Sequence, residues 1–158
     1  MPKPRIGSNQ VDALVGTAAL TSRWVERLLA AHDPPLSLGQ FTALRAIGRV
    51  HLGAAELARR TGVSGPAVSQ LVASLEQSGW IERSRAKDDR RRQELEQTAE
   101  GRRVLTSASD LLSERIMPLL STLPHPEQDA LARLLPRLEA ALDGTPPPRR
   151  PPPPPRPR

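Results

Sequence analysis

The side chains with the clearest chemical potential in this sequence are hydrogen-bonding and cationic groups in two neighbouring segments. Ser64, Ser69 and Gln70 stand at the start of a segment with helical periodicity, just after a glycine. Glutamine can pair bidentately with adenine, and serine can donate to or accept from a base edge. Further along, Arg90 to Arg92 supply the positive charge that phosphate groups attract. These residue types favour binding of a nucleic acid over bond making or breaking.

The elements that must position the first group form a helix-turn-helix pattern. The segment 53–61, GAAELARRT, predicts a short helix that Gly62 ends, and Ser64 is expected to cap the helix that follows. Proline is tolerated in the first turn of that second helix, because amides there have no helical partner. Its apolar face consists of Val68, Leu71, Val72 and Leu75.

A helix-turn-helix inserts its second helix into the DNA major groove by the N-terminal end. That end must be small or polar, since bulky apolar groups would block the approach. The residues expected to contact DNA are Ser64, Gly65, Pro66, Ser69 and Gln70. Simpler readings stay open, because Ser64 could be only a cap and Gln70 only a solvated helix position.

A charged hairpin is expected behind this helix. Gly79 suits the left-handed position after a helix end, and residues 80–85, WIERSR, read as a strand. The charged turn AKDDRRR precedes a returning strand, QELEQT, in which only Leu95 is apolar. We expect the turn to be a wing whose Arg90, Arg91 and Arg92 reach phosphates or a minor groove. Asp89 is expected to hold Arg91 by an ion pair, although an ordinary solvated turn would show the same charges.

The rest of the chain is mostly helical by periodicity, at residues 11–32, 99–123 and about 127–142. Ser37 is a good cap for another helix, and Pro136 predicts a kink or a shortened last helix. The outer helices are too apolar for a small lone domain, so we expect them to pack against a second copy of the chain. The tail "GTPPPRRPPPPPRPR" cannot bury a core and is expected to be extended and disordered.

The composition narrows the class of protein. The chain has 158 residues, a net charge of +6 and no cysteine, which excludes disulfides, thiol catalysis and cysteine-ligated zinc. Residues 83–92 and the tail from Thr145 each carry a net charge of +4, so the remainder is net negative. No apolar run approaches the roughly 20 residues that cross a bilayer, and no secretory signal is evident, so a cytoplasmic protein without membrane contact is expected.

Catalytic and metal-binding patterns find little support. No phosphate-binding glycine loop, Gly-x-Ser-x-Gly or His-Glu-x-x-His motif occurs, so an enzyme and a cofactor are not expected. The three histidines are widely spaced and lack a local ligand partner: His32, His51 and His125. A regulatory metal site is therefore the less favoured hypothesis, and no metal is predicted.

From "SLGQFTALRAI" through "ELARRTGVSGPAVSQLVASLEQSGWIER" to a "DDRR" wing and "TAEG", the sequence resembles the MarR-type winged helix-turn-helix transcriptional regulators. The resemblance covers about residues 11–142 and is most specific over 56–101. Asp89 and Arg91 match the second half of the family's Asp-x-Arg-Asp-x-Arg wing motif, while Ala86 and Asp88 replace its first Asp and Arg. Gln97 replaces a usual leucine.

The resemblance implies a mainly α winged helix-turn-helix fold with a short β-hairpin wing and an intertwined helical dimerisation region. It implies a homodimer that binds a pseudo-palindromic operator in double-stranded DNA, as a repressor released by a small aromatic or phenolic ligand. Because the effector clefts of the family border the first helix, Trp24 is a candidate ligand-lining residue. Release by cysteine oxidation is excluded by composition.

The predicted organisation has four parts: an N-terminal arm at 1–10, dimerisation helices at 11–35 and 102–142, a DNA-binding lobe at 36–101, and the tail at 143–158. Two other functions remain open. The chain could be a non-sequence-specific or architectural DNA-binding protein that uses its basic wing and tail. It could also be an interaction module that acts through the proline-rich tail.

Overall fold

The computed structural model describes residues 7–50, 52–85 and 93–143, and within them it is mainly helical with one two-stranded sheet. The elements in chain order are α1 (Ser8–Ala30), α2 (Leu38–Arg49), α3 (Ala54–Thr61), α4 (Gly65–Gln77), β1 (Ile81–Arg85), β2 (Gln93–Gln97), α5 (Ala99–Leu120) and α6 (His125–Asp143). This order confirms the predicted winged helix fold class. In the described part of the chain, no helix is long and apolar enough to cross a membrane.

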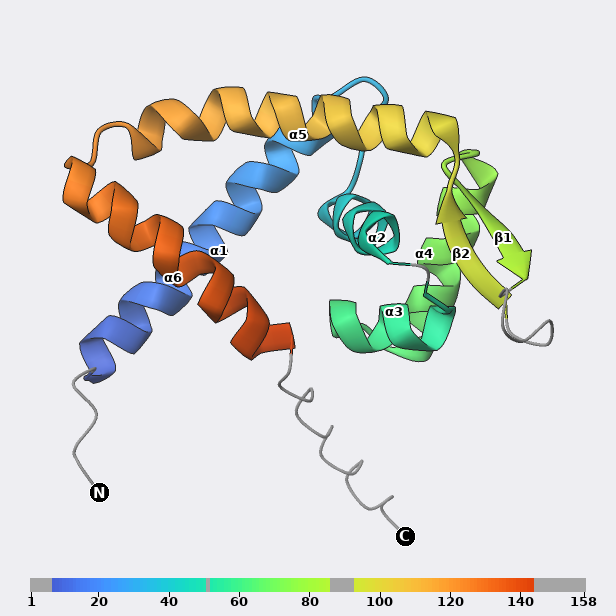
Figure 1. The fold of residues 1–158 in the computed structure, drawn as a ribbon, viewed down its shortest axis with the longest axis horizontal. Coiled ribbons are helices and arrows are strands. Elements are labelled where there is room, and N and C mark those ends of the chain that lie inside the picture. The colour runs from blue at the N-terminus through green and yellow to red at the C-terminus, as the bar shows by residue number, and fades with distance from the viewer. Residues whose placement is uncertain (1–6, 51, 86–92, 144–158) are drawn as a thin grey trace, which may run out of the picture.

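The long helix α5 joins two parts of the molecule (Figure 1). Its first half lies over a lobe made of α2, α3, α4 and the β1–β2 hairpin, while its second half runs out toward α1 and α6. Helix α1 begins far from the lobe's hairpin, whereas α6 runs from the end of α5 back toward α3 (Figure 1). The arrangement resembles the predicted division into a lobe and a helical region.

The hydrophobic core sits in the lobe and under α5. The fully buried large side chains are Leu29, Leu44, Leu57, Leu75, Leu95, Val68 and Val72. They come from α1, α2, α3, α4 and β2, so one cluster holds the helix-turn-helix, the hairpin and the end of α1 together. Burying a side chain of this size stabilises a fold by about 1.5–3 kcal/mol, and the cluster therefore fixes the lobe as a unit.

The predicted turn signals agree with the backbone in most places. Ser37 caps α2, because its Oγ accepts from the Gln40 amide at 3.1 Å while the Gln40 side chain accepts from the Ser37 amide at 2.9 Å. Gly62 and Gly79 have φ values of +68° and +70°, which only glycine adopts without strain. The cap at Ser64 differs, since its side chain makes no capping hydrogen bond in α4. Pro66 in the first turn has no amide hydrogen, so one donor that a cap would satisfy is already missing.

The hairpin forms despite the weak alternation of its second strand. The strands pair antiparallel from Ile81 opposite Gln97 to Arg85 opposite Gln93. Leu95 is buried, and its amide donates to the Leu52 carbonyl at 2.9 Å. One buried leucine, anchored by the backbone that precedes α3, is therefore enough to place β2 against the core.

Several helix boundaries differ from the sequence prediction by a few residues. Helix α1 begins at Ser8, ahead of the predicted start at residue 11. Helix α6 continues through Pro136 to Asp143, so the predicted shortening is wrong. Proline removes the hydrogen bond to the carbonyl of Ala132, but Ala132 is exposed and water can hydrate that carbonyl.

A single copy leaves large apolar side chains on its outer helices in water. Leu14, Val15 and Leu20 on α1 are 53%, 64% and 61% exposed. On α6, Leu134 and Leu142 are 60% and 65% exposed. Such a concentration is unusual for a small monomeric protein and marks a surface suited to another apolar surface.

Candidate nucleic-acid interface

The candidate interface starts at the N-terminal end of α4. Val68, Val72 and Leu75 are buried against the lobe core, which turns the opposite face of α4 to solvent. The five residues predicted to contact DNA are all exposed at this end of α4: Ser64, Gly65, Pro66, Ser69 and Gln70. The structure thus brings them together on one accessible surface. Their contact with DNA stays a prediction.

Two of the polar side chains on that surface, those of Ser69 and Gln70, differ in the hydrogen bonds that they make within the helix. The Ser69 hydroxyl donates to the Gly65 carbonyl at 3.1 Å, one turn back. A hydroxyl oxygen that donates in this way keeps lone pairs to accept from a base or water. Gln70 is exposed one position further along α4. Its amide can both donate and accept, which is what a bidentate adenine contact requires.

Arg83 ties the hairpin to α4. Its Nε donates to Glu76 Oε1 at 2.7 Å and its Nη2 to Glu76 Oε2 at 3.2 Å, while Nη1 donates to Gln93 Oε1 at 3.2 Å. Hydrogen bonding to Glu76 raises the pKa of Arg83 above its ordinary value. One guanidinium therefore contacts the last turn of α4 and both strands. Asp89, Arg90, Arg91 and Arg92, the predicted wing residues, lie outside the described residues.

The junction between the hairpin and α5 is closely packed. Thr98 Oγ1 donates to the Gly79 carbonyl at 2.6 Å and accepts from the Gly101 amide at 3.0 Å, so it caps α5 and holds the turn after α4. A Cβ on Gly101 would overlap the Trp80 carbonyl. Gln97, the departure from the family pattern, donates from Nε2 to the Leu44 carbonyl at 2.7 Å. The glutamine thus makes a polar link between β2 and α2 where the family carries an apolar residue.

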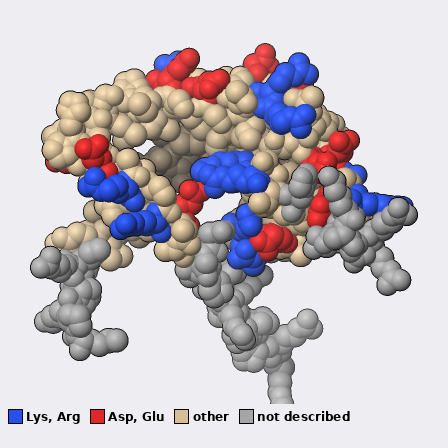
Figure 2. Space-filling view, viewed as in Figure 1, with Lys and Arg blue, Asp and Glu red and all other residues tan. Residues whose placement is uncertain are grey.

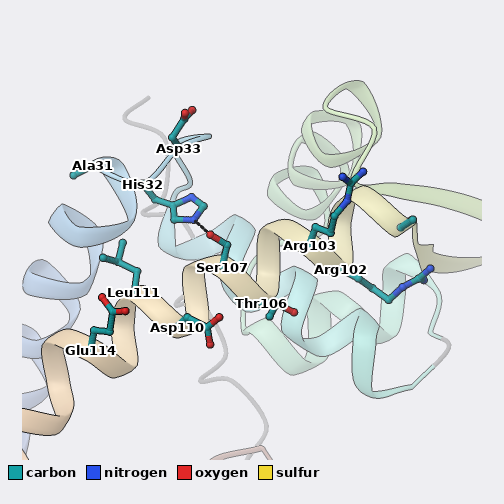
Figure 3. Close-up of a pocket in the computed structure, with 11 residues that line it drawn as sticks. Ala31, His32, Asp33, Arg102, Arg103, Thr106, Ser107, Asp110, Leu111 and Glu114 are labelled. Carbon is teal, nitrogen blue, oxygen red and sulfur yellow. Dashed lines mark hydrogen bonds between the residues drawn. The ribbon is translucent and has the colours of Figure 1, made fainter.

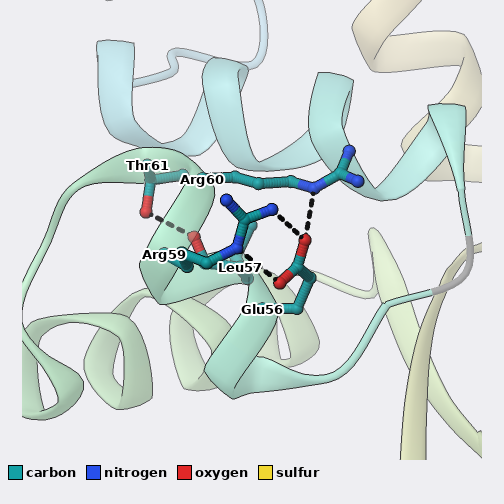
Figure 4. A network of polar contacts seen from close by, with 5 residues as sticks. All are labelled: Glu56, Leu57, Arg59, Arg60 and Thr61. Carbon is teal, nitrogen blue, oxygen red and sulfur yellow. Dashed lines mark hydrogen bonds and ion pairs between the residues drawn. The ribbon is translucent and has the colours of Figure 1, made fainter. Parts of the chain in front are cut away.

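The Glu56 carboxylate accepts hydrogen bonds from two arginines of α3, Arg59 and Arg60 (Figure 4). Arg59 donates from Nε to Oε2 at 2.8 Å and from Nη2 to Oε1 at 2.6 Å, and Arg60 donates from Nε to Oε1 at 2.9 Å. These hydrogen bonds lower the pKa of Glu56 from 4.5 to about 2. The carboxylate is therefore ionised at any physiological pH.

A cleft of about 770 Å³ separates α6 from the lobe. One wall carries cationic side chains of α2 and α3, namely Arg45, Arg49 and Arg60. The other wall is the apolar side of α6, with Leu135, Leu138 and Leu142. Glu139 crosses it, because its Oε1 accepts from both Arg45 and Arg49 at 3.1 Å. Figure 2 shows cationic side chains beside the hollow between the two parts of the molecule.

A second cleft of about 830 Å³ lies where the end of α1 meets α5 (Figure 3). His32 is buried there, with Nδ1 2.7 Å from the Pro34 carbonyl and Nε2 2.9 Å from Ser107 Oγ. A carbonyl only accepts, so Nδ1 carries a proton and donates to Pro34, while Nε2 is in hydrogen-bond contact with the Ser107 hydroxyl. His32 therefore links α1 to α5 and is satisfied by protein groups.

Trp24, the predicted ligand-lining residue, is half-buried on α1 and lines neither of these two clefts. Its proposed role has no support from their geometry. Among the described residues no cluster of three or more His, Asp or Glu side chains could hold a metal ion.

Sequence reasoning missed several of these residues for different reasons. Glu56 stands three and four positions before its arginines, and that spacing on a helix is a readable signal. Glu139 and Gln97 reach partners far away in the sequence, so no local spacing points to them. The ion pair of Arg83 with Glu76 spans a helix, a turn and a strand, and only the folded lobe brings the two together.

The lobe with its exposed helix α4 and its hairpin defines the class: the chain is a winged helix-turn-helix protein. Residues 34–92 match the sequence model of the MarR family.

Solved structures with the same fold agree. The transcriptional regulator BldR from Sulfolobus solfataricus is 26% identical, with a TM-score of 0.69 over 87% of this chain and 99% of that one. The MarR family protein Rv2887 from Mycobacterium tuberculosis, in complex with p-aminosalicylic acid, is 26% identical, with a TM-score of 0.65 over 84% and 98%. FabT from Streptococcus pneumoniae, in complex with DNA, is 19% identical, with a TM-score of 0.69 over 85% and 96%.

No curated protein sequence matches the chain. Over residues 34–92 the chain is therefore similar to the MarR family, and over most of its length it shares the fold of solved transcriptional regulators of the winged helix-turn-helix class.

Proposed function

We propose that the chain is a MarR-type transcriptional regulator that acts as a homodimeric repressor and binds a pseudo-palindromic operator. The observation that carries the proposal is the exposed, small and polar N-terminal end of α4, held rigidly by a buried apolar face on its other side. Ser64, Gly65 and Pro66 allow close approach to the groove, and Ser69 and Gln70 supply the base contacts. FabT, which shares this fold, was solved in complex with DNA, and this supports the same use of the lobe.

Dimerisation is supported by the apolar side chains that α1 and α6 leave exposed. A second copy would remove them from water and would present two α4 helices to two half-sites about one helical turn apart. Such a regulator works on chromosomal DNA, and we place it in the cytoplasm on that ground.

Release by a small organic acid is supported by the cleft between α6 and the lobe. Arg45 and Arg49 already bind one carboxylate, that of Glu139, and the facing wall of α6 is apolar. An acid with an apolar body has the matching chemistry, and it would bind across the two parts whose relative position sets the spacing of the α4 helices. Rv2887 was solved with such an acid, p-aminosalicylic acid.

The test is a fluorescence anisotropy titration with the duplex DNA found immediately upstream of the chain's own gene. An excess of random-sequence competitor is present and the salt concentration is varied. We expect binding that survives the competitor and protects two half-sites. Binding that disappears into the competitor at moderate salt would favour the rival function, a DNA-binding protein without sequence preference that uses the basic wing and tail.

A further inference from the structure

In the last turn of α3, Arg59 already uses two of its guanidinium donors within the protein. The Arg59 guanidinium presents two parallel donors, Nε and Nη2, and both go to the carboxylate of Glu56 at 2.8 and 2.6 Å. A guanidinium fork binds carboxylate and phosphate with the same bidentate geometry. Glu56 therefore occupies the position that a phosphate group would take on Arg59.

Arg59 lies in α3, the helix that precedes the proposed recognition helix α4. Helix α3 is the first helix of the helix-turn-helix, the one that crosses the DNA backbone in this docking mode. Arg59 lies just before the Gly62 turn that leads to Ser64, and 51% of its side chain is exposed. The neighbouring Arg60 is 30% exposed and lines the cleft toward α6. Of these two arginines, Arg59 is the one that is placed to reach a phosphate.

We propose that Glu56 is an internal competitor of DNA phosphate, which keeps Arg59 from contributing to DNA binding and so limits attraction to DNA of any sequence. The inference rests on the proposed DNA-binding function of the lobe. Glu56 suits this role because the two arginines hold its pKa at about 2, so the carboxylate stays charged wherever DNA binding occurs. A neutral glutamine at position 56 keeps the shape of the side chain but loses the charge that holds Arg59.

The slope of log affinity against log salt measures how many phosphates the protein neutralises, at about 0.9 per phosphate. The full chain is titrated against a random-sequence duplex by fluorescence anisotropy at several salt concentrations. We expect Glu56→Gln to steepen the slope by about 0.9. Arg59→Gln alone should leave the slope of the wild type unchanged, and the Glu56→Gln/Arg59→Gln double variant should return to the wild-type slope.

The matched control is Glu100→Gln. Glu100 forms an ion pair with Arg103 in the first turn of α5, with the same spacing of three residues and the same change of one charge, and we expect it to leave the slope unchanged. Equal steepening by Glu56→Gln and Glu100→Gln would show a general charge effect and overturn the proposal. A lower slope for Arg59→Gln alone would also overturn it, because Arg59 would then already contact a phosphate. A wild-type chain that binds no DNA would remove the proposed function together with this inference.

Discussion

At the scale of single residues, Glu56 decides how much of the positive charge of α3 is free to bind DNA, because it accepts hydrogen bonds from two arginines. Its carboxylate is bound by three guanidinium nitrogens, and its pKa falls from 4.5 to about 2. A carboxylate whose pKa is lower in the folded state contributes stability that is fully present above its unfolded pKa. That contribution is lost as the pH falls from 4.5 toward 2.

This shift predicts a specific pH dependence. We expect the difference in Tm between the wild type and Glu56→Gln to be constant from about pH 7 to about pH 5, and to narrow only below the unfolded pKa. Because the Glu56 side chain is partly open to solvent, the difference in Tm itself should be small. Thermal unfolding followed by circular dichroism measures it. A difference that already narrows near pH 6 would assign the shift to another group.

Gln70 and Arg91 are expected to act differently on DNA. Gln70→Ala should relax preference at one base position, at a cost of about 1–3 kcal/mol if the side chain contacts an adenine edge. Arg91→Ala should weaken binding to every sequence and reduce the salt slope by about one phosphate. Competition titrations with single-base operator variants separate the two. Equal losses on all sequences for both substitutions would contradict this division.

Gly101 should tolerate no side chain, because a Cβ would overlap the Trp80 carbonyl at the junction of hairpin and α5. We expect Gly101→Ala to destabilise the fold by about 1–3 kcal/mol, measured by urea unfolding. The control is Gly39→Ala in α2, where the added Cβ meets only Ser37 Oγ at an ordinary 3.7 Å. Similar stability for the two variants would mean that the junction adjusts easily.

At the scale of elements, the helix-turn-helix could be read from the sequence because its signals are local. The two glycines with positive φ and the apolar face of α4 stand where their spacing predicts. Leu95 could be read as the single buried residue of β2, but not as a partner of Leu52, because that pairing depends on where the chain before α3 runs. Ser64 stands at the predicted N-cap position of α4, but its side chain makes no capping hydrogen bond, and Pro66 removes one of the amide donors in the first turn.

Only the local part of the candidate site could be predicted from the sequence. Residues of α4 lie next to one another in the sequence, so a face could be predicted from helix geometry. Arg83 and Glu76, or Glu139 and Arg45, meet only because the chain folds back on itself. The ion pair between Glu139 of α6 and Arg45 of the lobe thus depends on tertiary structure, and no spacing in the sequence predicts it.

At the scale of the whole molecule, binding of two half-sites requires a dimer, which we expect α1 and α6 to form. Leu14 is 53% exposed in one copy, and burial against a second copy would stabilise the dimer by about 1.5–3 kcal/mol. We therefore expect Leu14→Glu to raise the dimer dissociation constant at least about tenfold, measured by sedimentation velocity. Gln77→Glu, at an exposed polar position in the last turn of α4 and away from α1 and α6, serves as the control. A variant that stays as dimeric as the wild type would place the interface elsewhere.

Sequence-specific binding by a dimer is tested most directly by selecting bound duplexes from a random DNA library with the full chain. The most enriched duplex is then examined by hydroxyl-radical footprinting. The account predicts an enriched inverted repeat whose two protected half-sites lie about 34 Å apart, one for each α4 helix. Enrichment of no sequence, or protection of a single uninterrupted stretch without symmetry, would contradict a sequence-specific dimeric regulator.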